Sequence, residues 1–277
     1  MKIIENSETF VQIVNSYRHE KKHCSTNLLL MQDKINDLID AGKLYYDLID
    51  GILWFFEKNN DFYIAYFYLP KEEKLKLIPQ DLDVIVEIVG NQVRYNIQWE
   101  MELLESGFEK YNRYIEIMAH KEQCQSMIEK QVEKIHSFVE RMGCYRRTAT
   151  KADYDKMYQL WRTKIDRYAI RTLTEKELDE MERSNRGYLI CNDKNEICVA
   201  GYYSRTDNTA NTGYLVSLYK GFGAVASYER MASMFREGCD RYIGWTRENN
   251  TDMLMIARKF AVETGKFSQQ FLMRKVN

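Results

Sequence analysis

The stretch Thr212-Gly-Tyr-Leu-Val-Ser-Leu-Tyr-Lys-Gly-Phe-Gly-Ala224 decides the fold of this chain. Its first half is apolar and predicts a strand, two glycines follow, and the apolar residues Met231, Met234 and Phe235 then recur at helical spacing. A strand, a glycine-rich turn and a helix start form an anion-binding device. Glycine lets backbone N–H groups converge on a phosphate, and the helix N-terminus adds partial positive charge. Lys220 can add a full charge.

The segments on both sides of this stretch form an ordered series. A hairpin precedes it, with apolar strands at 187–191 and 196–203 joined by an Asn/Asp/Lys turn. Before the hairpin, helices are predicted at 154–161 and from Thr174, which opens a capping box with Glu177. A strand near 241–245 and a helix near 253–260 follow. This order predicts a mixed α/β domain.

A similar pattern occurs in the first half of the chain. The apolar segments 51–56 and 61–68 flank the turn 57–60 and match the later hairpin. Arg113-Tyr-Ile115 recurs as Arg241-Tyr-Ile243, each after a helix with a late glycine. The alternative is that two α+β domains of similar size share short aromatic strands by chance. We predict a duplication, with domains at 1–143 and 144–277 and the helix 121–141 closing the first. The fold class is α/β (α+β), each domain having a mixed, mostly antiparallel sheet flanked by helices.

The stretch 218–223 resembles the signature Gln/Arg-x-x-Gly-x-Gly/Ala of the GNAT superfamily, the Gcn5-related N-acetyltransferases. Both glycines are present, but Leu218 occupies the Gln/Arg position. A second resemblance is an asparagine after the fifth strand of that fold, here Asn250, before a helix. The resemblance covers 145–276 and implies acetyl-CoA as co-substrate and no metal. The implied cofactor-binding residues are Val216, Leu218, Lys220, Gly221, Phe222, Gly223, Ala224 and Asn250.

Many members of this superfamily carry a tyrosine on the helix after that asparagine, where it protonates the leaving thiolate. The matching position here is Ala257. The candidates for a catalytic acid are therefore Tyr214 and Tyr219, each with packing as its alternative role. In the first copy, the counterpart of the loop is expected near 89–93, with one glycine and no lysine before it. We expect that copy to be degenerate.

Composition limits the classes of partner. The 277 residues carry a formal net charge of −1, which gives no overall electrostatic reason to expect nucleic acid. No apolar run approaches the ~20 residues of a membrane span, and the N-terminus lacks the apolar core of a signal peptide. The six cysteines form no Cys-x-x-Cys pair and read as reduced thiols. These features predict a cytoplasmic protein without a membrane partner.

His19-Glu-Lys-Lys-His23 matches the His-Glu-x-x-His pattern of zinc proteases, which needs both histidines on one helix face. On a helix, Phe10, Val14 and Tyr17 would lie on the side opposite to these histidines. A catalytic pair should face a packed cleft. We therefore interpret the motif as a solvated helix face.

The resemblance implies acyl transfer, of acetyl in the first instance, to a small-molecule or peptide amine. Two alternatives remain open at this stage. One is tRNA-dependent aminoacyl transfer of the cell-wall type, which also uses tandem GNAT-like domains but needs a basic tRNA surface. The other is a CoA-binding protein without turnover, which the residues at Leu218 and Ala257 keep open.

Overall fold

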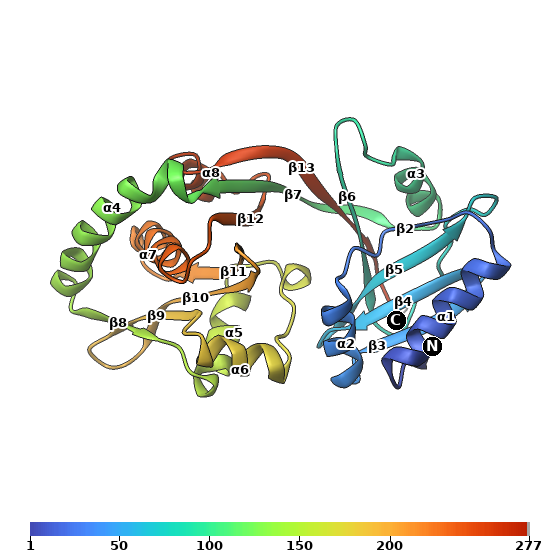
Figure 1. Cartoon of the computed structure of the whole chain (residues 1–277), viewed down its shortest axis with the longest axis horizontal. Coiled ribbons are helices and arrows are strands. Elements are labelled where there is room, and N and C mark those ends of the chain that lie inside the picture. The colour runs from blue at the N-terminus through green and yellow to red at the C-terminus, as the bar shows by residue number, and fades with distance from the viewer. Residues whose placement is uncertain (276–277) are drawn as a thin grey trace. The chain divides into compact units, whose positions relative to one another are not determined.

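The chain forms two compact units, each with its own helices and strands (Figure 1). The computed structural model describes residues 1–275. The first unit consists of Met1–Tyr114 together with the segment that starts at Gly265, and the second is Ile115–Thr264. The chain passes between the units within two strands, β7 (Glu109–His120) and β13 (Val262–Met273). This division differs from the expected boundary between residues 143 and 144.

In the described residues, the first unit has three helices and a sheet. Its elements in chain order are β1 (Lys2–Ile3), α1 (Ser7–Glu20), β2 (Cys24–Thr26), α2 (Gln32–Asp40), β3 (Leu44–Ile49), β4 (Ile52–Lys58), β5 (Phe62–Pro70), β6 (Asp83–Asn91) and α3 (Ile97–Glu105). The strand order is β1-β3-β4-β5-β6-β13, with β2 also pairing with β5. All these pairs are antiparallel except β5–β6, which is parallel.

The second unit has helices on both faces of its sheet. Its elements are α4 (Lys121–Arg141), β8 (Cys144–Thr148), α5 (Tyr154–Arg162), α6 (Glu175–Arg183), β9 (Gly187–Asn192), β10 (Ile197–Thr206), β11 (Thr209–Ser217), α7 (Phe222–Arg236), β12 (Arg241–Arg247) and α8 (Thr251–Ala257), with 3₁₀ turns at Lys151–Asp153 and Arg167–Ala169. The order is β7-β12-β11-β10-β9-β8, and only the β11–β12 pair among β8–β12 is parallel. The mixed, mostly antiparallel sheets confirm the predicted fold class.

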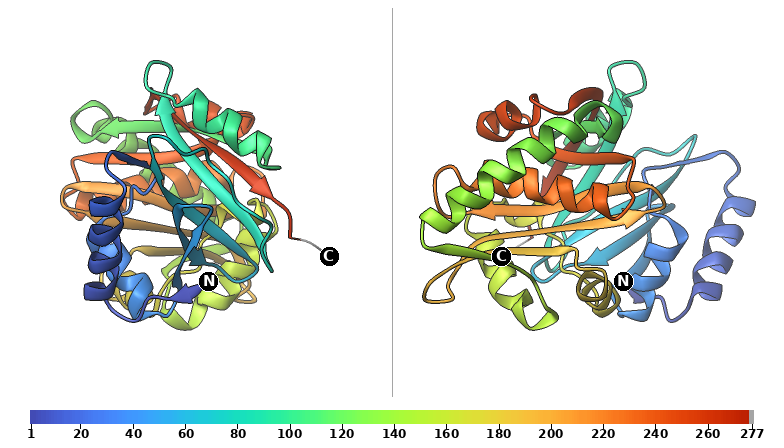
Figure 2. Two further views of the ribbon diagram at one scale, coloured as in Figure 1. Left: turned by 90° about the vertical axis from the view of Figure 1, so that its right-hand side faces the viewer. Right: turned by 60° about the vertical axis from the view of Figure 1, so that its left-hand side comes forward.

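The second unit has two apolar cores, one on each face of its sheet. One core joins α4 and α7 to the sheet and includes Ile128, Met231 and Tyr242. The other joins α5 and α6 to the opposite face and includes Trp161 and Leu189. Figure 2 shows α4 and α7 on one side of these strands and α5 and α6 on the other. The predicted strand and helix order of this half is confirmed throughout.

Two expectations about the first half are wrong. The helix α4 does not close the first unit, because its apolar side packs on α7 in the second. The proposed repeat is also shifted by one strand. Each unit has a parallel pair, β5–β6 in the first and β11–β12 in the second, which makes β5 the counterpart of β11 rather than of β10. The two hairpins look alike in sequence because both are buried and aromatic. The composition of a strand depends on its burial and does not indicate its position in the sheet.

The His19–His23 motif is not held on one helix. The helix α1 ends at Glu20, and His23 lies beyond it with a left-handed φ of 63°. Lys21 is the C-cap residue: its N–H still donates to Tyr17 O, but its backbone is no longer helical. The paired geometry that a His-Glu-x-x-His zinc site needs is therefore not formed.

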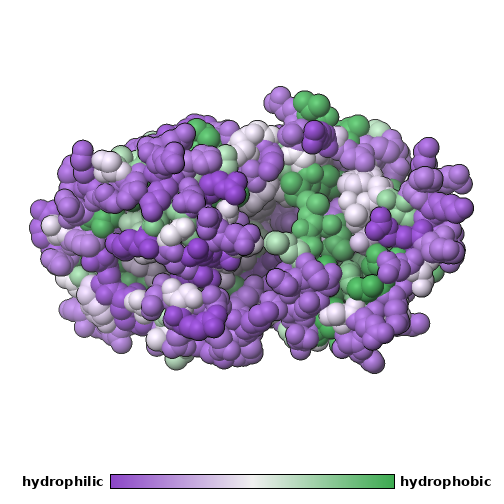
Figure 3. Space-filling model, viewed as in Figure 1, coloured by the Kyte–Doolittle hydropathy of each residue, from purple (hydrophilic) through white to green (hydrophobic). Residues whose placement is uncertain are grey.

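One face of the molecule is mostly hydrophilic, with hydrophobic residues gathered on the part formed by the first unit (Figure 3). All six cysteines are free, and only Cys24 is less than buried. Within residues 1–275, every helix is too short or too polar to cross a membrane.

Candidate functional site

The strand β11 is irregular where it faces Tyr202 of β10. Its pairing runs regularly from Ser217 to Leu215, then resumes at Thr212, so that Gly213 and Tyr214 together oppose one residue. This is a β-bulge, which bends a strand and redirects its side chains. Gly213 is required here, because a Cβ at this position would lie 2.5 Å from the Tyr202 ring.

The neighbouring strand β12 separates from β11 at the same level. Their parallel pairing covers three residue pairs and ends at Asn211 and Ile243, although both strands continue for several residues. We call this point of separation the fork. Beyond it, the edge of β11 that faces away from β10 pairs with no described strand.

The alternation of the β10–β11 ladder shows which backbone groups point into the fork. Leu218 N–H donates to Cys198 O at 2.9 Å, so the N–H of Val216 also points toward β10. The N–H groups of Leu215 and Ser217 therefore point toward the open edge. The predicted cofactor-binding residues Val216 and Leu218 thus direct their N–H groups toward β10, and Ser217 between them directs its N–H toward the open edge.

At the end of β11 the chain turns sharply into α7. Gly221 is the N-cap residue with a φ of 88°, a conformation that glycine adopts at little cost. No side chain caps this helix. Phe222 N–H donates to Tyr219 O, while Gly223 and Ala224 lie in the first turn, where N–H groups have no acceptor within the helix. The predicted strand, glycine turn and helix start are therefore present. Anion binding by this turn stays a prediction.

The side chains of the loop divide into exposed and buried groups. Lys220 is exposed, and so is Leu218 at 51%. Phe222 is buried and packs edge-on against the rings of Phe138 and Tyr219. The loop is thus anchored by Phe222, while its charge faces solvent.

Asn250 caps the helix α8. Its side-chain oxygen accepts from Met253 N at 3.2 Å. This helix-capping contact accounts for an asparagine at this place without a ligand. Its role in cofactor binding stays a prediction. Ala257, on the same helix, is buried in the core beside α7.

Tyr214 and Tyr219 lie on opposite faces of the sheet. The ring of Tyr214 packs on Trp161 at 5.0 Å between centroids, and its hydroxyl accepts from Arg171 N at 2.6 Å. Tyr219 packs on the α7 side, where the neighbouring Cys198 thiol raises its pKa. Only Tyr214 lies at the bulge, so the two hydroxyls cannot serve one reacting atom. A catalytic role for either stays a prediction.

Sequence reasoning missed several polar residues on the α5–α6 face of the sheet. Asp166 accepts from Tyr168 N at 3.0 Å, and its carboxylate lies 3.8 Å from the guanidinium of Arg247 at the end of β12. Arg171 comes from the same connection between α5 and α6. No motif marks them, because Arg247 lies far along the chain from Asp166 and Arg171 and comes near Asp166 only in the folded unit.

In the first unit, the place where β5 and β6 would separate is filled by residues of the same unit. The parallel β5–β6 pairing ends at Ala65 and Val86. Asn27 then bridges the two strands: its Nδ2 donates to Ala65 O and Glu87 O at 3.3 and 3.1 Å, and its Oδ1 accepts from Phe67 N at 2.8 Å. The strand β2 pairs with β5 directly beyond.

The first unit departs in two further ways. Its β4–β5 pairing is regular, without a bulge, and residues 71–82 after β5 form no helix. The counterpart of the glycine-rich loop therefore starts at residue 71. The expected position near 89–93 is wrong, because that segment ends β6, the counterpart of β12.

Several solved structures are similar to this chain, although no known protein-family model and no curated protein matches its sequence. A tandem GNAT protein from the clavulanic acid biosynthesis pathway aligns with 100% of this chain and 98% of its own, at 9% identity and a TM-score of 0.57. A GCN5-related N-acetyltransferase from Sphaerobacter thermophilus aligns over 97% and 93%, at 10% identity and a TM-score of 0.55.

A third similar structure is a GCN5-related glucosamine N-acetyltransferase region of a fungal multi-domain GH3 β-N-acetylglucosaminidase. It aligns with 98% of this chain but 38% of its own, at 7% identity and a TM-score of 0.62. Identities this low establish shape rather than activity. The chain has the tandem GNAT fold, with two GNAT-like units of which the first has its fork closed.

Proposed function

We propose that the second unit binds an acyl-CoA in the fork between β11 and β12 and transfers its acyl group to an amine. The observation that carries this proposal is the combination of an open, bulged strand edge with an uncapped helix N-terminus at its end. An extended chain with amide groups suits the edge, and a pyrophosphate suits the helix start. CoA has both parts in this order.

Each part of the site has a distinct task in the proposed reaction. The N–H groups of Gly223 and Ala224, with the charge of Lys220, bind the pyrophosphate. The N–H groups of Leu215 and Ser217 hold the pantetheine chain, and the bulge places the thioester at the fork. A backbone N–H there stabilises the oxyanion as the amine nitrogen attacks. The C–N bond forms, the C–S bond breaks, and the amine proton ends on the sulfur.

The acceptor is a small-molecule or peptide amine that approaches from the α5–α6 face. Asp166 and Arg247 lie on that side of the bulge and can bind a charged acceptor. Tyr214, directly at the bulge, is the favoured proton donor to the leaving thiolate.

Gly223→Asp tests the phosphate site. A negative charge in the first turn interacts favourably with the positive end of the helix dipole, so the melting temperature of the variant should not fall. The same charge repels a pyrophosphate, so CoA affinity measured by calorimetry should drop at least tenfold, about 1.4 kcal/mol.

Gly221→Ala and Gly238→Ala form a matched pair at the two ends of α7. Both glycines have a φ near +90°. A Cβ would meet open space at Gly238 and only the Phe138 ring, at 4.0 Å, at Gly221, so each variant should lose about 1 kcal/mol of stability. Only Gly221→Ala should weaken the binding of CoA. Native protein that does not bind CoA or acetyl-CoA at millimolar concentration would refute the proposed function.

A further inference from the structure

Arg230, in the middle of α7, is a buried cation without a carboxylate partner among residues 1–275. Its side chain is 3% exposed, and its Nε and Nη1 have no hydrogen-bond partner among the described residues. Burial lowers its pKa, and the Tyr242 hydroxyl is its one counteracting neighbour. The preceding residue, Glu229, is equally buried but interacts with His136 and Arg146. One charge of α7 is therefore neutralised and the next is not.

The contact with Tyr242 places Arg230 beside the fork. The Tyr242 hydroxyl lies 3.2 Å from the position that a Cβ on Gly244 would take, and Thr212 Oγ1 lies 2.7 Å from the same position. Thr212 directly follows the last residue of β11 that pairs with β12, and Gly244 is the corresponding residue of β12. The guanidinium thus lies on the α7 side of the point where the strands separate.

A buried guanidinium with open donors costs several kcal/mol of folding stability, and an apolar residue of similar size would avoid that cost. A carboxylate is the group that best satisfies such a donor, because it accepts two parallel N–H bonds from one guanidinium. Within residues 1–275, the carboxylate nearest in sequence, on Glu229, is held by other partners. The missing acceptor should therefore come from a ligand.

We propose that Arg230 binds the terminal carboxylate of the donor's acyl group, so that the donor is a short dicarboxylic acyl-CoA of the malonyl or succinyl class. This inference rests on the proposed function, in which the thioester lies at the fork with the pyrophosphate at the start of α7. The acyl carbons then extend beyond the thioester toward Arg230. The reaction joins the amine nitrogen to the acyl carbonyl carbon and releases CoA thiol, leaving the distal carboxylate unchanged.

The test compares four probes on the native chain by calorimetry: CoA, acetyl-CoA, butyryl-CoA and succinyl-CoA. Butyryl-CoA matches succinyl-CoA in chain length and lacks only the carboxylate. Succinyl-CoA should bind at least tenfold more tightly than butyryl-CoA. Equal binding of the three acyl-CoAs overturns the assignment of Arg230 and leaves the proposed function standing. Failure of CoA itself to bind refutes the proposed function instead.

Arg230→Met tests the residue, with Arg236→Met as the control from the exposed side of the same helix. Arg230→Met should keep butyryl-CoA affinity, lose the preference for succinyl-CoA, and melt no lower than native protein because it removes an unpaired charge. Arg236→Met should keep the preference. A preference that survives in Arg230→Met overturns the proposal, and the comparison on the native chain is informative even if the variant folds poorly.

Discussion

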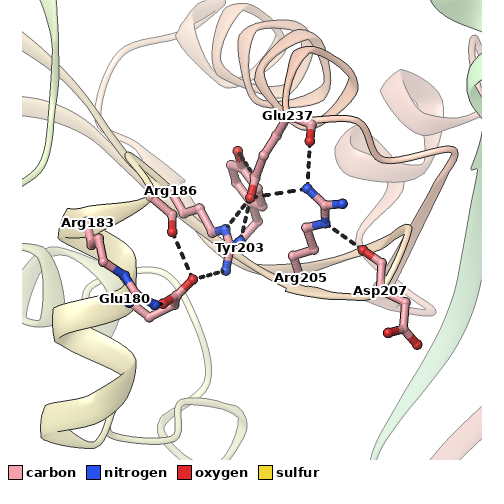
Figure 4. Close-up of polar contacts among 8 residues, drawn as sticks. Glu180, Arg183, Arg186, Tyr203, Arg205, Asp207 and Glu237 are labelled. Atoms are coloured by element: carbon pink, nitrogen blue, oxygen red, sulfur yellow. Dashed lines mark hydrogen bonds and ion pairs between the residues drawn. The ribbon is translucent and has the colours of Figure 1, made fainter.

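Glu237, directly after α7, holds together two side chains of β10, Tyr203 and Arg205, and that of Arg186, which precedes β9 (Figure 4). Its carboxylate accepts from Arg186 Nε and from the Tyr203 hydroxyl, each at 2.9 Å, and Arg205 lies 3.7 Å away. Burial by itself raises the pKa of Glu237, but the hydrogen bonds and charges of these partners bring it below the ordinary value of 4.5. The charged form is therefore stabilised by folding.

Glu237→Gln should lower the stability by about 2 kcal/mol at pH 7, because it removes a charge that accepts several hydrogen bonds. A lowered pKa stabilises the fold above the ordinary pKa and loses this effect as the pH falls through the lowered value. The difference in melting temperature between native and variant should be constant from pH 7 to about 5 and shrink below about 4.5. Asp193→Asn, in an exposed turn, is the control. A difference that persists unchanged to pH 3 would contradict this assignment.

At the scale of the element, the short strand β2 and Asn27 close the corresponding fork of the first unit, between β5 and β6. Asn27 is 8% exposed and satisfies three backbone groups on two strands. Such groups are costly to leave buried without partners. In the proposed function the same position in the second unit takes a ligand, so the two units would share a fold but not a site.

Asn27→Ala should therefore destabilise the chain by about 2–4 kcal/mol, measured by urea unfolding. Gln12→Ala, which removes an exposed hydrogen bond within α1, should cost less than about 0.5 kcal/mol. Comparable losses in the two variants would show that Asn27 does not hold β5 and β6 together.

At the scale of the whole molecule, one fork per chain is open. We expect one CoA bound per chain, because the first unit lacks the bulge, the following helix and the open edge. Calorimetry gives this number directly. Two equivalent sites per chain would refute the closure of the first fork, and Gly223→Asp provides the control because it should abolish the single site.

The second half was predictable because its signals are local. The glycine-rich turn, the capping box at Thr174 and the apolar periods of the helices each act over a few residues. The duplication was visible for the same reason, but its alignment was shifted, because aromatic hairpins recur wherever strands are buried. The parallel pair that corrects it is a non-local contact.

The sequence by itself determined the order of strands and helices in the second unit, the turn at Gly221, and the presence of Ala257 where many superfamily members carry a tyrosine. Those features follow from backbone preferences and side-chain spacing along one segment. Only the tertiary structure decided that Asn27 closes the fork of the first unit and that Arg230 lies beside the fork of the second with no carboxylate partner in the described part of the chain. Both depend on strands and helices distant in the chain, since burial and the partners of a polar group exist only once the sheet has formed.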